Sequence, residues 1–164
     1  MKRAVLFLAG LVLSTAACES AEQARLEESR ETWTALKAQN GSSYRYTAQG
    51  GSWTGYSWET TVEVLQNHVA RRAYTSETDT GTVDAAWSEE GATLGSHGSG
   101  APPLTMEGIY DKCASEVLTR DPGKNWITLT FQSDGVLESC SYFPHNCQDD
   151  CAVGVGVSSL EFIH

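Results

Sequence analysis

The sequence lacks any apolar run that could cross a lipid bilayer. A membrane-spanning helix takes roughly 20 apolar residues, whereas the longest apolar run here covers only residues 4–13. Basic residues are also scarce, because 11 Lys and Arg stand against 21 Asp and Glu and the formal net charge is −10. A surface this acidic repels nucleic acid and anionic lipid headgroups. The composition therefore excludes a nucleic-acid-binding protein.

The sequence also lacks the common catalytic motifs. It contains no G-x-S-x-G, no H-E-x-x-H and no P-loop. Ser96 and His97 are neighbours in a Gly-rich stretch, but nucleophilic catalysis needs a nucleophile, a base and an orienting group brought together in space. No carboxylate pair can be nominated for glycoside hydrolysis. We therefore expect a non-catalytic protein without a cofactor, and a hydrolase is the least favoured alternative.

The sequence does contain a predicted secretory signal at its N-terminus. A basic start, a short apolar run and small residues up to Ala17 predict a signal peptide over residues 1–17. Cys18 follows at once, and the arrangement resembles the lipobox of bacterial lipoproteins, in which this cysteine is acylated and becomes the mature N-terminus. Thr15 departs from the usual Leu of that motif, so ordinary secretion with an unmodified Cys18 is the alternative.

The lipobox resemblance implies a location as well as a modification. It implies a protein of the bacterial cell envelope that is held to the membrane through its N-terminal lipid. Glu19 stands where enteric bacteria place the Asp that retains lipoproteins in the inner membrane. We therefore expect the outer membrane, on its periplasmic or surface face.

The number of cysteines, five, supports the hypothesis that Cys18 is acylated. If Cys18 carries lipid, an even set of four remains, and cysteines in an oxidising compartment form disulfides. Cys113 falls on the apolar face of a predicted helix and Cys140 on the apolar face of a predicted strand, so we predict the pairs Cys113–Cys140 and Cys147–Cys151. Pairing of Cys140 with Cys151 across a hairpin is the chief alternative.

Two kinds of metal site are conceivable around Cys147 and Cys151. His145 lies close to Cys147, but the spacing matches no standard zinc ribbon. Asp149 and Asp150 offer carboxylate oxygens for calcium, but no EF-hand-like spacing surrounds them. We expect a solvated acidic loop and no metal.

The sequence pattern of the N-terminal half predicts a tether, a helix and three strands. Residues 18–29 are polar and are expected to form a tether, with the packed helix beginning near Leu26 and a single domain over residues 30–164. Alternation with a period of two predicts strands around residues 44–47 and 56–64. A tight turn centred on Asn67 and His68 would then place Glu63 opposite Arg72. Residues 77–104 are rich in Gly, Ser, Thr and acids and predict a long loop.

The C-terminal half predicts one helix and three more strands. Thr105 is a candidate N-cap, and the helix after it carries Met106, Ile109, Cys113 and Val117 on one face. Residues 127–131 alternate, and a turn at Asp134-Gly135 pairs Leu129 with Cys140. In the last strand Val residues alternate with Gly154 and Gly156, which leaves one face without side-chain bulk.

These elements predict an α+β fold, in which an antiparallel sheet of about six strands in hairpins carries two helices on one face and is stabilised by disulfides. The pattern resembles a family of uncharacterised bacterial lipoproteins that share a domain of unknown function. The matching features are Trp33, the segment Ser43–Thr47, the strand before the tight turn, the helix that starts at Thr105 and the strand Ile127–Phe131. The resemblance implies a fold and a location but no activity.

Candidate ligand contacts are the aromatic residues Trp53, Tyr56 and Trp58. A stacking platform for a sugar or an apolar ligand is one interpretation, and a buried core is the other, with the core favoured for Trp58. We expect a non-catalytic module that binds a protein or an envelope component through the loops at 77–104 and 143–150. The alternative is a periplasmic carrier of a small ligand, with a pocket lined by these aromatics and by the Gly154 and Gly156 face.

Overall fold

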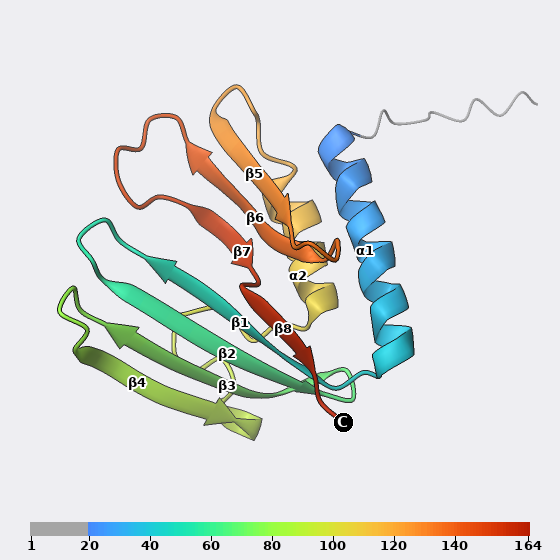
Figure 1. Ribbon diagram of the computed structural model, residues 1–164. Helices are drawn as coiled ribbons and strands as arrows, with labels where there is room; N and C mark the ends of the chain where they lie inside the picture. The colour runs from blue at the N-terminus through green and yellow to red at the C-terminus, as the bar shows by residue number, and fades with distance from the viewer. Residues whose placement is uncertain (1–19) are drawn as a thin grey trace, which may run out of the picture.

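The computed structural model describes residues 20–164, so the predicted signal peptide and Cys18 lie outside the described residues. Eight antiparallel strands form two sheets, and two helices pack beside them (Figure 1). The five-stranded sheet runs in the order β4 (Val83–Glu90), β3 (His68–Glu77), β2 (Ser57–Leu65), β1 (Tyr44–Gly51) and β8 (Ser159–Phe162). The three-stranded sheet runs in the order β5 (Asn125–Phe131), β6 (Leu137–Pro144) and β7 (Val153–Gly156). The α+β class is confirmed, with eight strands in two sheets in place of about six in one.

Helix α1 (Ala21–Asn40) begins earlier than the sequence analysis predicted. Ser20 caps it in a capping box with Gln23, and Gly41 ends it with a φ of 98°. Leu26 and Ser29 on this helix are both buried. The packed part of the helix therefore begins at Leu26, where the sequence predicted it, and residues 26–29 belong to the domain and not to a tether.

Helix α2 (Met106–Lys112) continues into a π-helical turn, η2 (Cys113–Val117). The Thr105 side chain caps the helix by accepting from the Gly108 amide, as predicted. The apolar face predicted for this segment is buried against β6 and β7. Helix α1 contacts α2 and β6, so both helices lie on one side of the three-stranded sheet (Figure 1).

Buried tyrosines connect the two helices and the sheets. The Tyr110 hydroxyl lies 2.8 Å from the Ser29 hydroxyl and accepts from the Leu137 amide at 3.1 Å, which joins α1, α2 and β6. Tyr44 on β1 accepts from the Met106 amide at 2.9 Å. Its ring meets Trp33 of α1 edge to face, with ring centroids 4.9 Å apart. Each hydroxyl has a partner, so the core buries these large rings without an unpaired polar group.

The hairpin between β2 and β3 differs from its predicted register by one residue. Gln66 and Asn67, with φ of 49° and 67°, form the turn, in place of Asn67 and His68. A bulge follows at Glu63 and Val64, so Glu63 pairs with Arg71 and not with Arg72. A two-residue hairpin turn with two positive φ values matches the twist of the strands. The observed register still places an arginine opposite Glu63, so the charge pairing did not distinguish the two registers.

The predicted loop at 77–104 contains a strand. Residues 83–90 form β4, which pairs with β3 over its length, and Gly91–Thr93 form a short 3-10 turn, η1. The acidic and small residues of β4 hide it in the sequence, because most of its side chains are exposed at the sheet edge. The loop prediction was therefore wrong for residues 83–93, and only the flanking residues remain outside regular structure.

Candidate binding cleft

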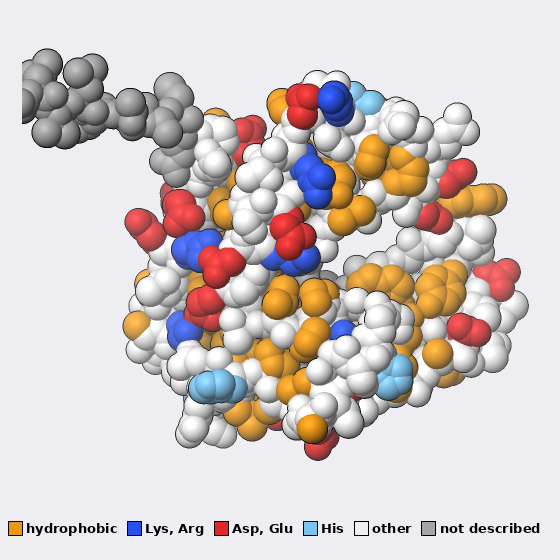
Figure 2. All heavy atoms as spheres, turned by 180° about the vertical axis from the view of Figure 1, so that it is seen from behind, with side chains coloured by type: hydrophobic (Ala, Val, Ile, Leu, Met, Phe, Trp, Pro, Cys, Tyr) orange, Lys and Arg blue, Asp and Glu red, His pale blue; other side chains and the backbone are white. Residues whose placement is uncertain are grey.

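A cleft opens where the last strand passes from one sheet to the other. Strand β7 pairs with β6, and after residues 157–158 the chain continues as β8 beside β1. At the crossing, the Val157 amide donates to Glu138 and the Ser158 amide to Thr47, both at 2.8 Å. Beyond this junction the sheets diverge and leave a cleft of about 710 Å³, which is seen as a hollow in Figure 2. That volume lies within the roughly 300–1,000 Å³ of ordinary ligand sites.

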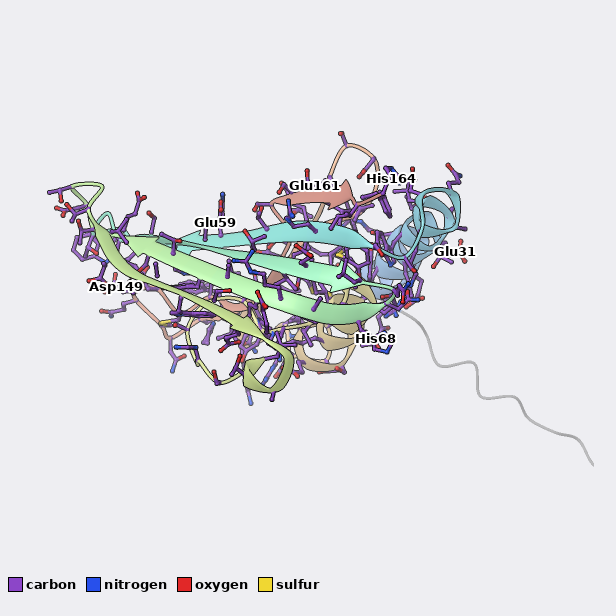
Figure 3. All side chains as sticks on the ribbon, turned by 90° about the horizontal axis from the view of Figure 1, so that it is seen from below. Glu31, Glu59, His68, Asp149, Glu161 and His164 are labelled. Atoms are coloured by element: carbon purple, nitrogen blue, oxygen red, sulfur yellow. A yellow bond between two sulfur atoms is a disulfide. The ribbon has the colours of Figure 1, made fainter. Side chains whose placement is uncertain are left out.

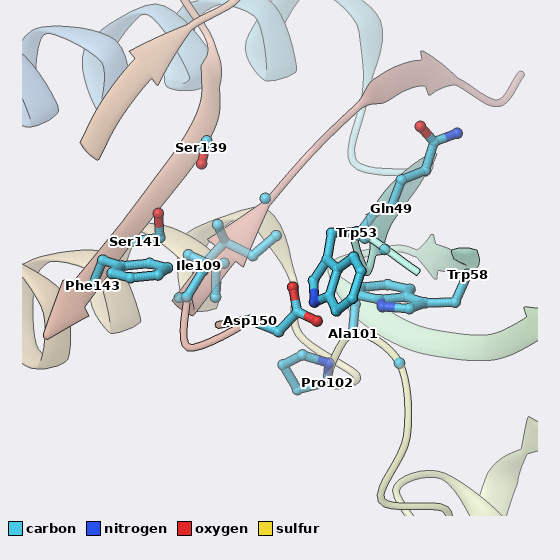
Figure 4. A pocket seen from close by; sticks show the side chains of 18 of the residues that line it. Gln49, Trp53, Trp58, Ala101, Pro102, Ile109, Ser139, Ser141, Phe143 and Asp150 are labelled. Atoms are coloured by element: carbon cyan, nitrogen blue, oxygen red, sulfur yellow. The ribbon is translucent and has the colours of Figure 1, made fainter. Parts of the chain in front are cut away.

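The wall formed by the five-stranded sheet is aromatic (Figure 4). Trp58 of β2 is half-buried and lies over Gly50 of β1, where an added Cβ would fall 2.5 Å from the indole ring. Trp53, in the turn between β1 and β2, is 78 % exposed and also lines the cleft. Trp58 is thus at the edge of the core and not inside it, because the core ends where the sheets separate.

Small residues make up much of the opposite wall. Gly154 and Gly156 of β7 line it together with Ser139, Ser141 and Phe143 of β6. An added Cβ on Gly154 would fall 2.1 Å from the Cys140 carbonyl oxygen, so a larger residue would push β7 away from β6. The glycine face predicted from the sequence therefore forms a cleft wall.

An acidic loop closes the outer end of the cleft. Asp149 and Asp150 line the cleft, and the Ser52 hydroxyl donates to the Asp150 carboxylate at 2.6 Å. Asp149 lies at the end of the molecule opposite Glu31 of α1 (Figure 3). Cys147 and Cys151 form a disulfide around this loop, and Cys113 and Cys140 form the second one in the core, with Cα atoms 5.7 Å apart. These are the two pairs that the sequence favoured.

Tyr56 is the one predicted contact that the cleft does not include. Its hydroxyl lies 2.8 Å from the Tyr74 hydroxyl on β3, and it is not among the residues that line the cleft. Trp126 of β5 is 58 % exposed and packs beside His145 at a centroid distance of 4.4 Å. It also lies outside the cleft lining, so it is an exposed tryptophan of a different surface.

A buried ion pair holds the remaining cleft wall in place. Arg72 of β3 donates to Glu89 of β4 at 2.9 Å, and both side chains are almost fully buried. The same guanidinium donates to the carbonyl oxygens of His97 at 2.7 Å and Ala101 at 3.0 Å. Ala101 lines the cleft, so Arg72 fixes the position of this part of the wall. Sequence reasoning missed this pair, because an acid in an edge strand is ordinarily exposed.

The Glu89 carboxylate also organises the loop that covers it. It accepts from the amides of Gly95 and His97 and from the Ser96 hydroxyl. Burial alone raises the pKa of Glu89, but the hydrogen bonds from Arg72 and from these amides outweigh it and hold that pKa well below its usual range. Glu89 is therefore ionised at neutral pH and acts as the anchor of residues 95–97.

The contact between Ser96 and His97 does not form a nucleophile–base pair. His97 Nδ1 lies 2.9 Å from Glu89, and the Ser96 hydroxyl donates to the same carboxylate at 3.0 Å. A catalytic serine would have to lie on the other ring nitrogen, opposite the carboxylate that orients the histidine. The His97 ring stacks on Trp87 at 4.4 Å. The cluster thus holds a loop on the sheet.

The described part of the chain offers neither a metal-binding cluster nor a membrane-spanning helix. Residues 20–164 contain no group of three or more His, Cys, Asp or Glu side chains placed to hold a metal ion. No helix within that range is long and apolar enough to cross a membrane. Asp149 and Asp150 thus have no third ligand of these types among the described residues.

No protein-family model matches the chain, and no curated protein or solved structure matches it either. The predicted resemblance to lipoproteins with a domain of unknown function therefore stays a prediction.

Proposed function

We propose that this protein is a non-catalytic binding module that takes its ligand into the cleft between the two sheets. The observation that carries the proposal is the exposed Trp53 beside an already formed cleft that Trp58 also lines. A tryptophan left 78 % exposed is unfavourable in water, and covering it with a ligand stabilises the complex. Of the two binding hypotheses from the sequence, the cleft favours the pocket-based one.

The chemistry of the walls supports binding rather than turnover. The cleft offers aromatic faces, serine hydroxyls, Gln49 and two carboxylates, which recognise a ligand by stacking and by hydrogen bonds. The most strongly shifted carboxylate, Glu89, is buried behind the wall and tied to Arg72. It holds the cleft in shape and has no access to a bound ligand.

The first test replaces Trp53. The Trp53→Ala variant is expected to lose about tenfold or more in affinity, because removing a stacked indole forfeits roughly 1.5–3 kcal/mol of burial. The probes are the peptide, glycan and lipid fractions of a bacterial envelope extract, and binding to the immobilised full-length protein is followed by biolayer interferometry.

Trp126→Ala is the matched control, since it also removes an exposed tryptophan, one that does not itself line the cleft and touches the lining only through the ring of Phe143. It should bind every fraction as the wild type does. Equal binding by wild type and Trp53→Ala in the fraction that binds would refute the assignment of the cleft.

The proposal includes the place where the protein acts. Acylation at Cys18 would hold the module on the bacterial envelope, with α1 starting only a few residues later. Mass spectrometry of detergent-extracted protein should find the N-terminal peptide beginning at Cys18 and carrying acyl chains. An unmodified N-terminal peptide would contradict lipid anchoring, without bearing on the cleft.

A further inference from the structure

Strand β1 leaves part of its backbone edge unpaired where it borders the cleft. On one side it pairs with β2 over its whole length, Tyr44–Gly51. On the other side it pairs with β8 only over Tyr44–Thr47, because the chain crosses to the other sheet at that point. Residues 48–51 therefore have no neighbouring strand on the side of the cleft within the described chain.

The hydrogen bonds around β1 show which backbone groups face this gap. Ser43 and Thr47 accept from the Ile163 and Ser158 amides on the side of β8, and alternate residues of a strand point the same way. The next residues in this series are Gln49 and Gly51, so their N–H and C=O groups point toward the cleft. The Ser52 amide instead donates to Tyr56 on the side of β2, which agrees with this alternation.

Strand β7 presents a second free edge across the cleft. The Val157 amide donates to Glu138, so the odd-numbered residues of this segment face β6 and the even-numbered ones face away from it. Gly154 and Gly156 are therefore the residues whose backbone groups point away from β6, and both line the cleft. Glycine in a strand marks a place where another backbone can approach closely.

We infer that the cleft binds an extended stretch of basic polypeptide, which adds as a strand to the edge of β1. The inference rests on the proposed function and names the class of ligand. A free edge of four residues, about 13 Å of strand, offers main-chain hydrogen bonds, and side chains that alternate along the added strand reach the aromatic wall. Of the residues that line the cleft, two are acidic and none is Lys, Arg or His. This charge favours Lys and Arg in the ligand, and their cations also stack on exposed indoles.

A glycan explains less of the cleft. Sugars stack on tryptophan and bind carboxylates, and their hydroxyls can pair single backbone groups, but they do not repeat with the alternation of the N–H and C=O groups of Gln49 and Gly51 and so match this edge incompletely. Covering backbone groups without pairing them is unfavourable. An added strand pairs them, so a peptide uses both the aromatic wall and the edge.

The test selects peptides from a random phage-displayed decapeptide library on the full-length protein. Selected peptides are expected to be rich in Lys or Arg and to bind after chemical synthesis. Methylating alternate amide nitrogens of such a peptide removes the donors on one side and leaves its side chains unchanged, and it should weaken binding at least tenfold.

Gln49→Pro makes the matching change in the protein, because proline removes the amide that faces the cleft and is tolerated at a free strand edge. It should also weaken binding at least tenfold. Gln49→Ala is the comparison at the same position: it loses the side-chain hydrogen bond to Glu59 but keeps the amide, so it should weaken binding far less than Gln49→Pro does. If Gln49→Pro does not fold, as judged by its melting curve, the N-methylated peptides decide the question.

Three outcomes would overturn the inference. The first is that the library yields no enriched peptide. The second is that amide methylation leaves peptide binding unchanged, and the third is that the selected peptides are acidic. Chitohexaose is tested in parallel, and if it binds in a manner that depends on Trp53 while no peptide binds, the inference fails and the proposed function stands. Selected peptides that bind Trp53→Ala and wild type equally would contradict the proposed function itself.

Discussion

Replacing Arg72 by methionine is expected to lower the melting temperature by about 10 °C or more. The substitution leaves the Glu89 carboxylate in the protein interior without its cation, and it removes the donors to His97 and Ala101. Breaking a buried pair by removing one partner costs far more than the pair contributes as a whole. Since Ala101 lines the cleft, the same variant should also bind ligand more weakly. Differential scanning calorimetry measures the first effect.

Arg71 is the matched control on the same strand. Its side chain is about half exposed and lies 3.3 Å from Glu90, and exposed pairs of this kind contribute little. Arg71→Met should therefore shift the melting temperature by no more than about 2 °C. Adding Glu89→Gln to Arg72→Met removes the buried charge that has lost its cation, and it keeps an acceptor for the amides of residues 95 and 97. The double variant should therefore regain part of the lost melting temperature. A mild effect of Arg72→Met alone would show that water reaches Glu89.

The pH dependence of stability provides a second readout of the same pair. Because the folded-state pKa of Glu89 is held below its unfolded value of about 4.5, ionised Glu89 favours the folded state above pH 4.5. This contribution decreases as the pH falls below 4.5 and is lost once the pH passes through the folded-state pKa. The difference in melting temperature between wild type and Glu89→Gln should therefore shrink between pH 7 and pH 3. A constant difference would contradict the lowered pKa.

Removing the Cys113–Cys140 disulfide is expected to destabilise the protein by about 3.5 kcal/mol. The two cysteines are fully buried and lie 27 residues apart in the sequence. The bond thus closes a long loop that runs from the helical segment to the three-stranded sheet, and without it the unfolded chain gains conformational freedom. The double variant Cys113→Ala/Cys140→Ala should show this loss in urea unfolding.

The second disulfide offers a built-in comparison. Cys147 and Cys151 are only four residues apart, so the same reasoning gives about 2 kcal/mol for Cys147→Ala/Cys151→Ala. That bond closes the acidic tip rather than the core, so its removal should affect ligand binding more than its stability effect suggests. A larger loss of stability from this pair than from Cys113–Cys140 would refute the ordering.

Local patterns predicted a large part of the fold correctly. The period-two alternation found β1, β2 and β5, the turn at Asp134-Gly135 gave the correct register Leu129–Cys140 with β6, and Thr105 was identified as a cap. Each of these depends on a few neighbouring residues. Strand β4 and the turn at Gln66 and Asn67 were missed for the opposite reason. An edge strand with exposed polar side chains lacks a hydrophobic pattern. A bulge shifts the pairing of two strands by one residue, and no residue type in the sequence indicates where it will occur.

The candidate site was predicted in its parts but not in its shape. Trp53, Trp58, Gly154 and Gly156 were all singled out from the sequence, yet their meeting at one cleft depends on residues some 100 positions apart. Glu89 shows the same limit more sharply. Nothing near it in the sequence distinguishes it from Glu90, and only the packing of Arg72 and the loop above makes it a buried anion.

The sequence by itself determined the class of the fold, the cysteine pairs it favours and the acidic net charge, because composition and short-range periodicity are enough for these properties. Only the tertiary structure decided that the last strand divides between two sheets at Val157 and Ser158. That crossing depends on contacts between residues far apart in the sequence, because β7 pairs with β6 while β8 pairs with β1. It opens the cleft, exposes the edge of β1 and turns a half-buried tryptophan into a candidate ligand contact.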